Sequence, residues 1–161
     1  MKHQHSIEQF LYQLSAFCDV QDWDNYVEMY APEAEYHIPQ WKSEHVHATN
    51  PKREMSLLYY PNRDGLEDRI FRIRTGKSAA SNPMPRTLHL INNVRYQEDS
   101  EGNVEVQYSW VTHYYRFGES SHFFGRATCR LKPQGDSWQI TYKQVIVLND
   151  KIDSVFDFYH V

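Results

Sequence analysis

The first twenty positions carry apolar residues at intervals of three and four, the spacing that lines one face of an α-helix. These positions are Ile7, Phe10, Leu11, Leu14, Phe17 and Cys18. Ser6 precedes them as the expected N-cap, because a serine hydroxyl can accept a hydrogen bond from a free amide of the first turn. The pattern predicts an amphipathic helix that needs a partner surface.

Two further helices are expected. The second begins after Asp22, a suitable N-cap, and ends at Pro32, since proline lacks the amide hydrogen that continues a helix. Its apolar face is formed by Trp23, Tyr26, Val27 and Tyr30. The third runs from Asp64 or Gly65 to Gly76, a residue type that commonly terminates helices. Its inward-facing residues are Leu66, Ile70 and Ile73.

The remaining segments predict strands and loops. Residues 35–38 form a short strand candidate before Pro39, and the polar stretch 43–52 predicts an exposed loop. After Gly76 the apolar period changes to two, which is typical of half-buried strands. The four predicted strands cover residues 87–96, 104–110, 122–131 and 138–148, with turns at 101–103 and 133–136. The sequence predicts one α+β domain, residues 1–161, whose mostly antiparallel sheet curls around the helices as a cone or open barrel.

Composition narrows the function classes. The net charge of -4 and the pI near 6.1 argue against nucleic acid, whose phosphates are bound by clustered cations. The longest strongly apolar run, residues 145–148, is far shorter than a membrane span, and no secretory signal is recognised, so a cytoplasmic protein is expected. Cys18 and Cys129 do not suggest a disulfide framework. The aromatic content of 15% favours an oligomer, because tyrosine and tryptophan suit protein interfaces, although an aromatic core explains it equally well.

Candidate chemistry is sparse. His45 and His47 have a spacing that permits a metal site, but they lie in a polar segment and are expected to be solvated surface residues. His89, His113 and His122 fall in predicted strands, where acid/base roles compete with hydrogen-bonded core or interface roles. Two distant cysteines cannot supply the Cys₂His₂ set of a Rieske cluster. Glycine-rich nucleotide motifs and the Gly-x-Ser-x-Gly elbow are missing from the sequence.

A tyrosine- and arginine-rich stretch identifies a family resemblance. The segments 55–63 (MSLLYYPNR) and 65–73 (GLEDRIFRI) resemble the signature of the small subunits of aromatic-ring-hydroxylating dioxygenases. Residues 85–89 (PRTLH), 92–94 (NNV) and 157–161 (DFYHV) are similar to the same family, so the resemblance covers nearly the whole chain. Residues 39–41, 74–80 and 84–86 most resemble the anthranilate type and next the benzoate type.

The resemblance implies a fold, partners and cofactors. The fold would be a cone like that of nuclear transport factor and ketosteroid isomerase. Three copies would assemble with three large subunits, which would carry the Rieske [2Fe-2S] cluster and mononuclear Fe(II), while a separate reductase would use NADH and flavin. No catalytic, cofactor or metal residue would lie on this chain. Residues expected at subunit contacts are Tyr59, Tyr60, Arg63, Arg69, Arg72, Arg86, Phe158 and Tyr159.

Two alternatives stay open: a stand-alone isomerase or dehydratase using His89, His113 or Asp68, and a metal-independent ligand-binding module. Both require a deep cavity, whereas a scaffold should have a filled interior. The side chains expected to fill that interior are Trp110, Phe124 and Tyr142. The C-terminal tail from about Ser154 is also expected to be packed, because Phe156 and its aromatic neighbours would otherwise expose large apolar area.

Overall fold

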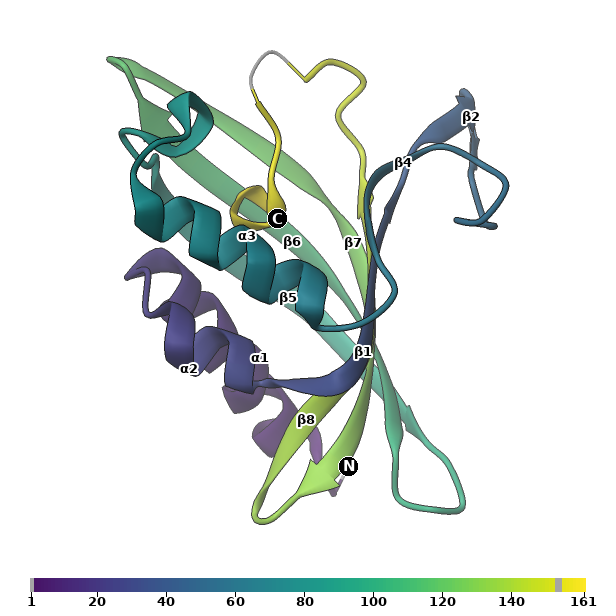
Figure 1. Ribbon diagram of the computed structural model, residues 1–161. Helices are drawn as coiled ribbons and strands as arrows, with labels where there is room; N and C mark the ends of the chain where they lie inside the picture. The colour runs from purple at the N-terminus through teal and green to yellow at the C-terminus, as the bar shows by residue number, and fades with distance from the viewer. Residues whose placement is uncertain (1, 153–154) are drawn as a thin grey trace.

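The computed structural model describes residues 2–152 and 155–161. The helices are α1 (Gln4–Asp19), α2 (Trp23–Glu28) and α3 (Asp64–Thr75), with 3-10 turns η1 (Ala79–Ser81) and η2 (Phe158–His160). The strands are β1 (Tyr30–Pro39), β2 (Trp41–Ser43), β3 (Val46–His47), β4 (Ser56–Tyr60), β5 (Arg86–Glu98), β6 (Val104–Arg116), β7 (Glu119–Gln134) and β8 (Ser137–Val147). Figure 1 shows the three helices on one side of a twisted sheet, with the C-terminal segment folded back beside α3. The predicted α+β architecture is confirmed.

The main sheet has six strands in the order β4-β1-β8-β7-β6-β5. The last four form an antiparallel meander, and β4 is antiparallel to β1. The pair β1 and β8 is parallel. The N-terminal strand therefore joins the sheet beside the last strand, which closes one side of the cone. β2 and β3 form a separate two-stranded hairpin.

Alternation along the long strands turns one sheet face toward the helices. In β6, Val104, Val106, Tyr108 and Trp110 are buried, whereas Glu105 and Gln107 between them are exposed. Helix α1 covers this face with Ile7, Leu11 and Leu14, each at most 4% exposed. The predicted strand period and the predicted helix face meet in one core, as an amphipathic helix on a half-buried sheet requires.

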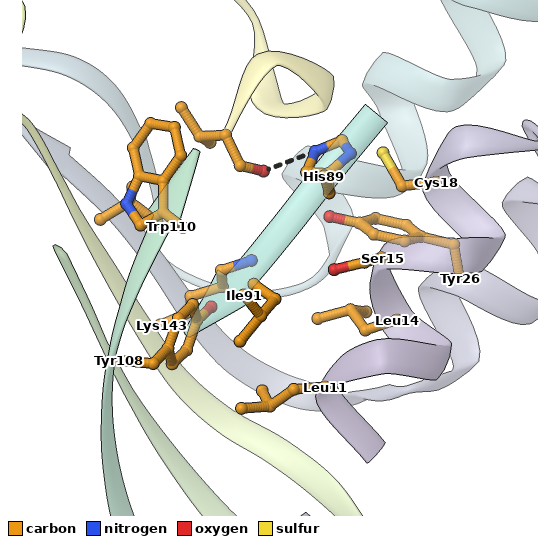
Figure 2. Close-up of a pocket in the computed structure, with 12 residues that line it drawn as sticks. Leu11, Leu14, Ser15, Cys18, Tyr26, His89, Ile91, Tyr108, Trp110 and Lys143 are labelled. Atoms are coloured by element: carbon orange, nitrogen blue, oxygen red, sulfur yellow. Dashed lines mark hydrogen bonds between the residues drawn. The ribbon is translucent and has the colours of Figure 1, made fainter. Parts of the chain in front are cut away.

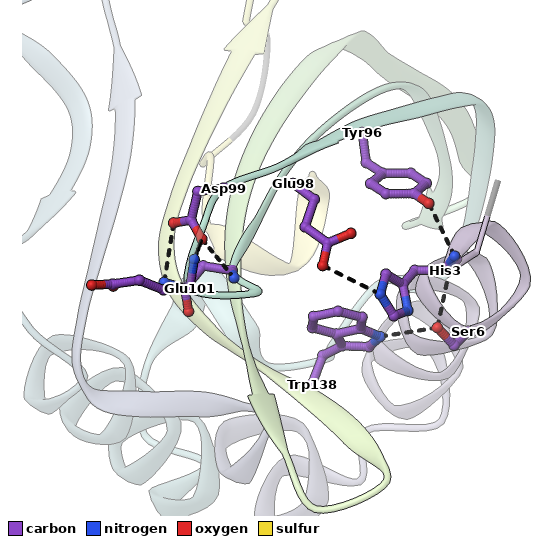
Figure 3. A network of polar contacts seen from close by, with 8 residues as sticks. His3, Ser6, Tyr96, Glu98, Asp99, Glu101 and Trp138 are labelled. Atoms are coloured by element: carbon purple, nitrogen blue, oxygen red, sulfur yellow. Dashed lines mark hydrogen bonds and ion pairs between the residues drawn. The ribbon is translucent and has the colours of Figure 1, made fainter.

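The start of α1 differs from the prediction. His3 is the N-cap and Ser6 lies inside the helix, where its hydroxyl donates to the His3 carbonyl at 3.0 Å and accepts from Trp138 Nε1 at 3.2 Å. Figure 3 shows this corner, in which Tyr96 Oη accepts from the His3 amide at 2.9 Å and Glu98 lies 3.6 Å from His3 Nε2. Tertiary partners on β5 and β8 thus decide where the helix begins.

The second helix is shorter than predicted. Asp22 caps it as expected, by accepting from the Asn25 amide, but the helix ends at Glu28. Tyr30 belongs to β1 and is fully buried. β1 continues through Pro32, because the β1–β8 ladder is irregular between Tyr30 and Glu35 and does not need the missing proline amide there.

Two segments carry structure that the sequence pattern did not predict. The expected loop 43–52 contains part of the β2–β3 hairpin, and the unassigned segment 56–60 forms β4. All five β4 residues are half-buried, so the strand lacks the inside–outside alternation that reveals strands in a sequence. α3 matches its prediction: Leu66, Ile70 and Ile73 are buried, and Gly76 ends it at a φ of 65°.

The C-terminal tail is packed, as expected for the part that is described. Phe158 and Tyr159 are 0% and 1% exposed, and Phe156 packs edge-on against Phe123 with ring centroids 5.1 Å apart. Ser154, where the expected tail begins, lies outside the described residues. No helix among residues 2–152 and 155–161 is both long and apolar enough to cross a membrane.

Candidate functional sites inside the cone and on the outer sheet face

A small cavity lies between the sheet and helices α1 and α2. It offers about 20 Å³ to the centre of a water molecule, enough for about one ordered water. Apolar side chains form most of its wall: Leu11, Leu14, Ile91, Trp110, Val145 and Val161. Of the polar groups that reach it, His89, Lys143 and Tyr108 come from three different strands, and Ser15 and Tyr26 come from α1 and α2 (Figure 2). Side chains therefore fill most of the interior, and only a few polar groups line the small cavity that remains.

His89 is held between two oxygen acceptors. Its Nδ1 lies 2.5 Å from Asp19 Oδ1, and its Nε2 lies 3.1 Å from the Val161 carbonyl oxygen. The two contacts fix the orientation of the ring, and each ring nitrogen has an oxygen partner. Burial opposes ionisation of Asp19, yet hydrogen bonds from His89 and Thr87 keep the pKa of its carboxyl below the usual range. The His89–Asp19 pair resembles an acid/base pair, but both partners are engaged in internal contacts.

Lys143 is the least expected interior residue. It is 4% exposed, and within the described part of the chain its amine makes no hydrogen bond and no ion pair. Its Nζ lies 5.7 Å from the ring centroid of Tyr36, whose own buried hydroxyl has no hydrogen-bond partner among the described residues. Burial lowers the pKa of Lys143, and burial also raises the pKa of the neighbouring Cys18 and Cys129 thiols. The interior therefore favours the uncharged forms of all three groups.

A buried ion pair anchors the tail. Arg69 Nε on α3 donates to the Asp157 carboxylate, and the two side chains are 17% and 5% exposed. Asp157 also accepts from the Phe158 amide, while its own amide donates to His160 Nδ1 at 2.9 Å. Burial lowers the pKa of His160 to about 4, so the neutral ring that this contact requires is the stable form. Tyr159 Oη donates to the Ala80 carbonyl and ties η2 to η1.

The residues predicted for subunit contacts fall into two groups. Six of them are engaged largely within the chain: Tyr59, Tyr60, Arg63, Arg69, Phe158 and Tyr159. Arg63, for example, donates to the Tyr30 carbonyl and to Glu67, and Tyr60 packs on Gly65. The rings of Phe158 and Tyr159 are buried in the core and are not presented on the surface. Arg72 and Arg86 are exposed and stay available to a partner.

The other candidate residues are dispersed. Asp68 is exposed on α3, and His45 is exposed in the small hairpin, where His47 Nδ1 contacts the Ala48 carbonyl. Of the three side chains expected to fill the interior, only Trp110 does so. Phe124 is 37% exposed, and Tyr142 lies under Arg130 on the far side of the sheet. Phe124 alternates with the buried Phe123 of β7 and so lies on the other face. Tyr142 follows an irregularity in the β7–β8 ladder, which turns it away from the face where Ile140 is buried.

The sheet face turned away from the helices, here called the outer sheet face, carries exposed apolar and basic side chains. Near the turn that joins β6 to β7, its exposed side chains come from β5, β6 and β7. They are Arg86, Leu88, Leu90, His113, Tyr115, His122 and Phe124. Leu88 and Leu90 are 56% and 49% exposed. A shallow hollow of about 310 Å³ lies among these side chains. Exposed apolar residues gathered on one face are typical of a protein contact surface.

Several of these groups had no signal in the sequence. Lys143 lies in a strand of alternating residues, where the sequence does not distinguish it from an exposed lysine. Asp19 is separated by seventy positions from His89, with which it pairs. Only the β5–β6–β7 register shows that His113 and His122 are direct neighbours. Within residues 2–152 and 155–161, no group of three or more His, Cys, Asp or Glu side chains is arranged to hold a metal ion.

The chain is similar in sequence to known proteins over nearly its whole length. The family model described as ring hydroxylating beta subunit matches residues 15–154. The chain is 49% identical to the anthranilate 1,2-dioxygenase small subunit of Acinetobacter baylyi, over 97% of this chain and 96% of that protein. It is 39% identical to the benzoate 1,2-dioxygenase subunit beta of the same organism, over 96% and 92%. The resemblance seen in the sequence is confirmed.

Solved structures agree. The beta subunit of benzoate 1,2-dioxygenase from Burkholderia mallei superimposes with a TM-score of 0.82 and 35% identity, covering 98% of this chain and 97% of that one. A scytalone dehydratase-like protein from Novosphingobium aromaticivorans gives a TM-score of 0.68 at 12% identity, covering 90% and 83%. The second likeness concerns the fold alone and confirms the cone-shaped architecture.

Proposed function

The chain belongs to the ring hydroxylating beta subunit family, and on that premise we propose that it is the non-catalytic small subunit of an anthranilate 1,2-dioxygenase. Its near full-length similarity to several dioxygenase small subunits supports the general assignment to an aromatic-ring-hydroxylating oxidoreductase. The anthranilate assignment rests on the higher identity, 49% against 39% for the benzoate relative.

The proposed reaction takes place on a partner chain. A large subunit would carry the Rieske cluster and the mononuclear Fe(II), and a reductase would deliver electrons from NADH through flavin. Anthranilate and O₂ would give catechol, CO₂ and ammonia. Three small and three large subunits would form the cytoplasmic complex. This chain would stabilise the large subunit by binding only its folded form, which shifts the folding equilibrium by mass action.

The observation that carries the non-catalytic role is the filled interior of the cone. A pocket for a small organic substrate usually measures roughly 300 Å³ or more, whereas the interior cavity offers about 20 Å³. The His89–Asp19 pair, which would be the natural acid/base pair of a dehydratase, is closed off by the Val161 carbonyl. The polar groups at this cavity hold the chain together and leave no room for a substrate.

The outer sheet face supports the partner assignment. Arg86 lies there beside exposed Leu88 and Tyr115, and its guanidinium is 5.7 Å from the Tyr115 ring centroid. Arginine and tyrosine next to apolar area are the composition that dominates binding energy at interfaces. The expected contact residues that stay exposed, Arg72 and Arg86, are the proposed direct contacts, while Arg69 contributes by holding the tail in place.

The test is reconstitution. A tag on this chain should capture the large subunit from a co-expressing strain, and the complex with its reductase and NADH should convert anthranilate to catechol faster than it converts benzoate. Exchange of this chain for a benzoate-type small subunit should leave the substrate preference unchanged. His89→Gln is the control for the dehydratase alternative: turnover by the isolated chain that this substitution abolishes would overturn the proposal.

A further inference from the structure

Two histidines face each other on the outer sheet face. His113 of β6 and His122 of β7 are directly opposed partners in the antiparallel ladder, with ring centroids 5.8 Å apart and an interplanar angle of 46°. Both side chains are exposed, and neither imidazole forms a hydrogen bond within the described part of the chain. The two imidazole rings are therefore close together on an exposed part of the sheet.

The separation suits a shared metal ion. With a metal–nitrogen distance of about 2.1 Å, the ring centroid lies about 3.2 Å from the metal. Two imidazoles on one ion then have centroids about 4.5 Å apart at a right angle between the bonds and about 6.4 Å apart when the bonds are opposed. The observed 5.8 Å falls inside this interval, so the spacing of the two rings is compatible with one shared ion.

The backbone under the pair is held firmly. The β6–β7 ladder pairs residues without interruption from Val104 and Leu131 to Arg116 and Glu119, so the two Cα positions are fixed before a metal arrives. Cross-strand pairs of this kind bring their side chains within contact distance. Little conformational entropy is then lost on chelation compared with two histidines on flexible loops.

The residues around the histidine pair indicate which metal ions it can bind. The hollow around the pair is lined by Arg86, Tyr115 and Ser120 as well as the histidines, and its lining includes no carboxylate. Imidazole nitrogen suits zinc, nickel and copper, whereas magnesium and calcium require oxygen ligands. Arg86 adds positive charge to the hollow, which weakens cation binding but favours an anionic molecule in the remaining coordination positions.

We propose that His113 and His122 form a two-histidine half-site for a divalent transition metal ion, with zinc as the probe. The chain supplies two ligands, and water or a carboxylate from solution completes the shell. Because structural zinc sites have four protein ligands, this half-site binds zinc reversibly and exchanges it. It lies on the outer sheet face that the proposed function assigns to the large-subunit contact, so the half-site is proposed for the chain before assembly with that partner. Zinc binding by the free chain does not depend on that assignment.

The experiment is a zinc titration of the full chain, purified without a histidine tag. Binding is measured by calorimetry and by NMR of the histidine side-chain resonances. At one equivalent of Zn²⁺, the His113 and His122 resonances should shift together. His113→Ala and His122→Ala should each weaken zinc binding by roughly tenfold or more. Loss of a residue that only hydrogen-bonds to a metal ligand already lowers metal affinity by about that factor. Arg86→Gln should strengthen it, because a nearby positive charge is removed.

His45→Ala is the matched control, since His45 is exposed in the hairpin β2–β3 and has a neighbouring histidine at position 47. It should leave the zinc affinity of the half-site unchanged. All substituted positions are exposed, so the variants should keep the wild-type circular dichroism spectrum. Zinc that shifts other histidines first, or binding that survives in both the His113→Ala and the His122→Ala variant, overturns the proposal.

Discussion

Replacement of Lys143 by methionine should stabilise the protein. The amine is 4% exposed and has no hydrogen-bond or ion-pair partner among the described residues. Burying a charge without a partner is costly, and burial accordingly lowers the pKa of the amine. Methionine has a similar length, adapts to irregular core space and carries no group that needs hydration. Among the described residues, the compensating contact for the protonated amine is the Tyr36 ring at 5.7 Å, which is worth about 0.5–2 kcal/mol.

The expected gain at pH 7 is about 1–3 kcal/mol, comparable to the replacement of buried ionic groups by apolar ones in other proteins. Since a change of 1 kcal/mol moves the melting temperature of a domain of this size by about 2–4 °C, the shift is easily measured. The assays are thermal unfolding, which gives the melting temperature, and urea unfolding, which gives the free energy of unfolding, both followed by tryptophan fluorescence. Lys132→Met is the control, because Lys132 forms a partly exposed pair with Glu33 whose loss should matter little.

The pH dependence gives an independent check. Burial lowers the pKa of Lys143 in the folded state below its ordinary value of 10.5. The unfolded chain therefore binds this proton more readily, and the contribution of Lys143 to stability falls as pH falls below 10.5. The advantage of Lys143→Met over wild type should accordingly shrink as pH rises from neutral toward 10.5. A variant less stable than wild type, or an advantage independent of pH, would refute the reasoning.

Three further predictions concern the tail and the sheet. Because burial lowers the pKa of His160 to about 4 from 6.5, stability should fall as pH drops from about 6.5 to 4, by about 3 kcal/mol in total. Urea unfolding should show this slope in wild type and not in His160→Gln. Gly125→Ala should cost about 3 kcal/mol or prevent soluble expression, because the added Cβ would lie 1.8 Å from the Ile146 carbonyl oxygen; an unchanged urea midpoint would contradict it. Arg69→Met should cost about 2–3 kcal/mol by leaving the buried Asp157 carboxylate unpaired, and faster amide exchange at residues 156–161 should accompany it. Slow exchange in that variant would show that the pair does not hold the tail.

Local chemistry allowed much of the fold to be predicted from the sequence. The three-and-four spacing of α1, the stop at Gly76 and the alternation along β6 each depend on near neighbours, so they are readable without a structure. The family segments 55–63 and 65–73 were equally visible, and they pointed to the dioxygenase small subunits. The net charge of -4 likewise argues against nucleic-acid binding from the sequence alone.

Tertiary structure decided what depends on distant partners. Ser6 could not be recognised as a helix-interior residue, because its role follows from Trp138 on the last strand. The β1–β8 pairing is parallel, and β4 is half-buried throughout, so neither follows from an alternating pattern. Which face of a strand turns inward is set by register, since a shift of one residue exchanges the two faces. Register placed Phe124 outside, Lys143 inside and His113 beside His122, which sequence spacing alone does not determine.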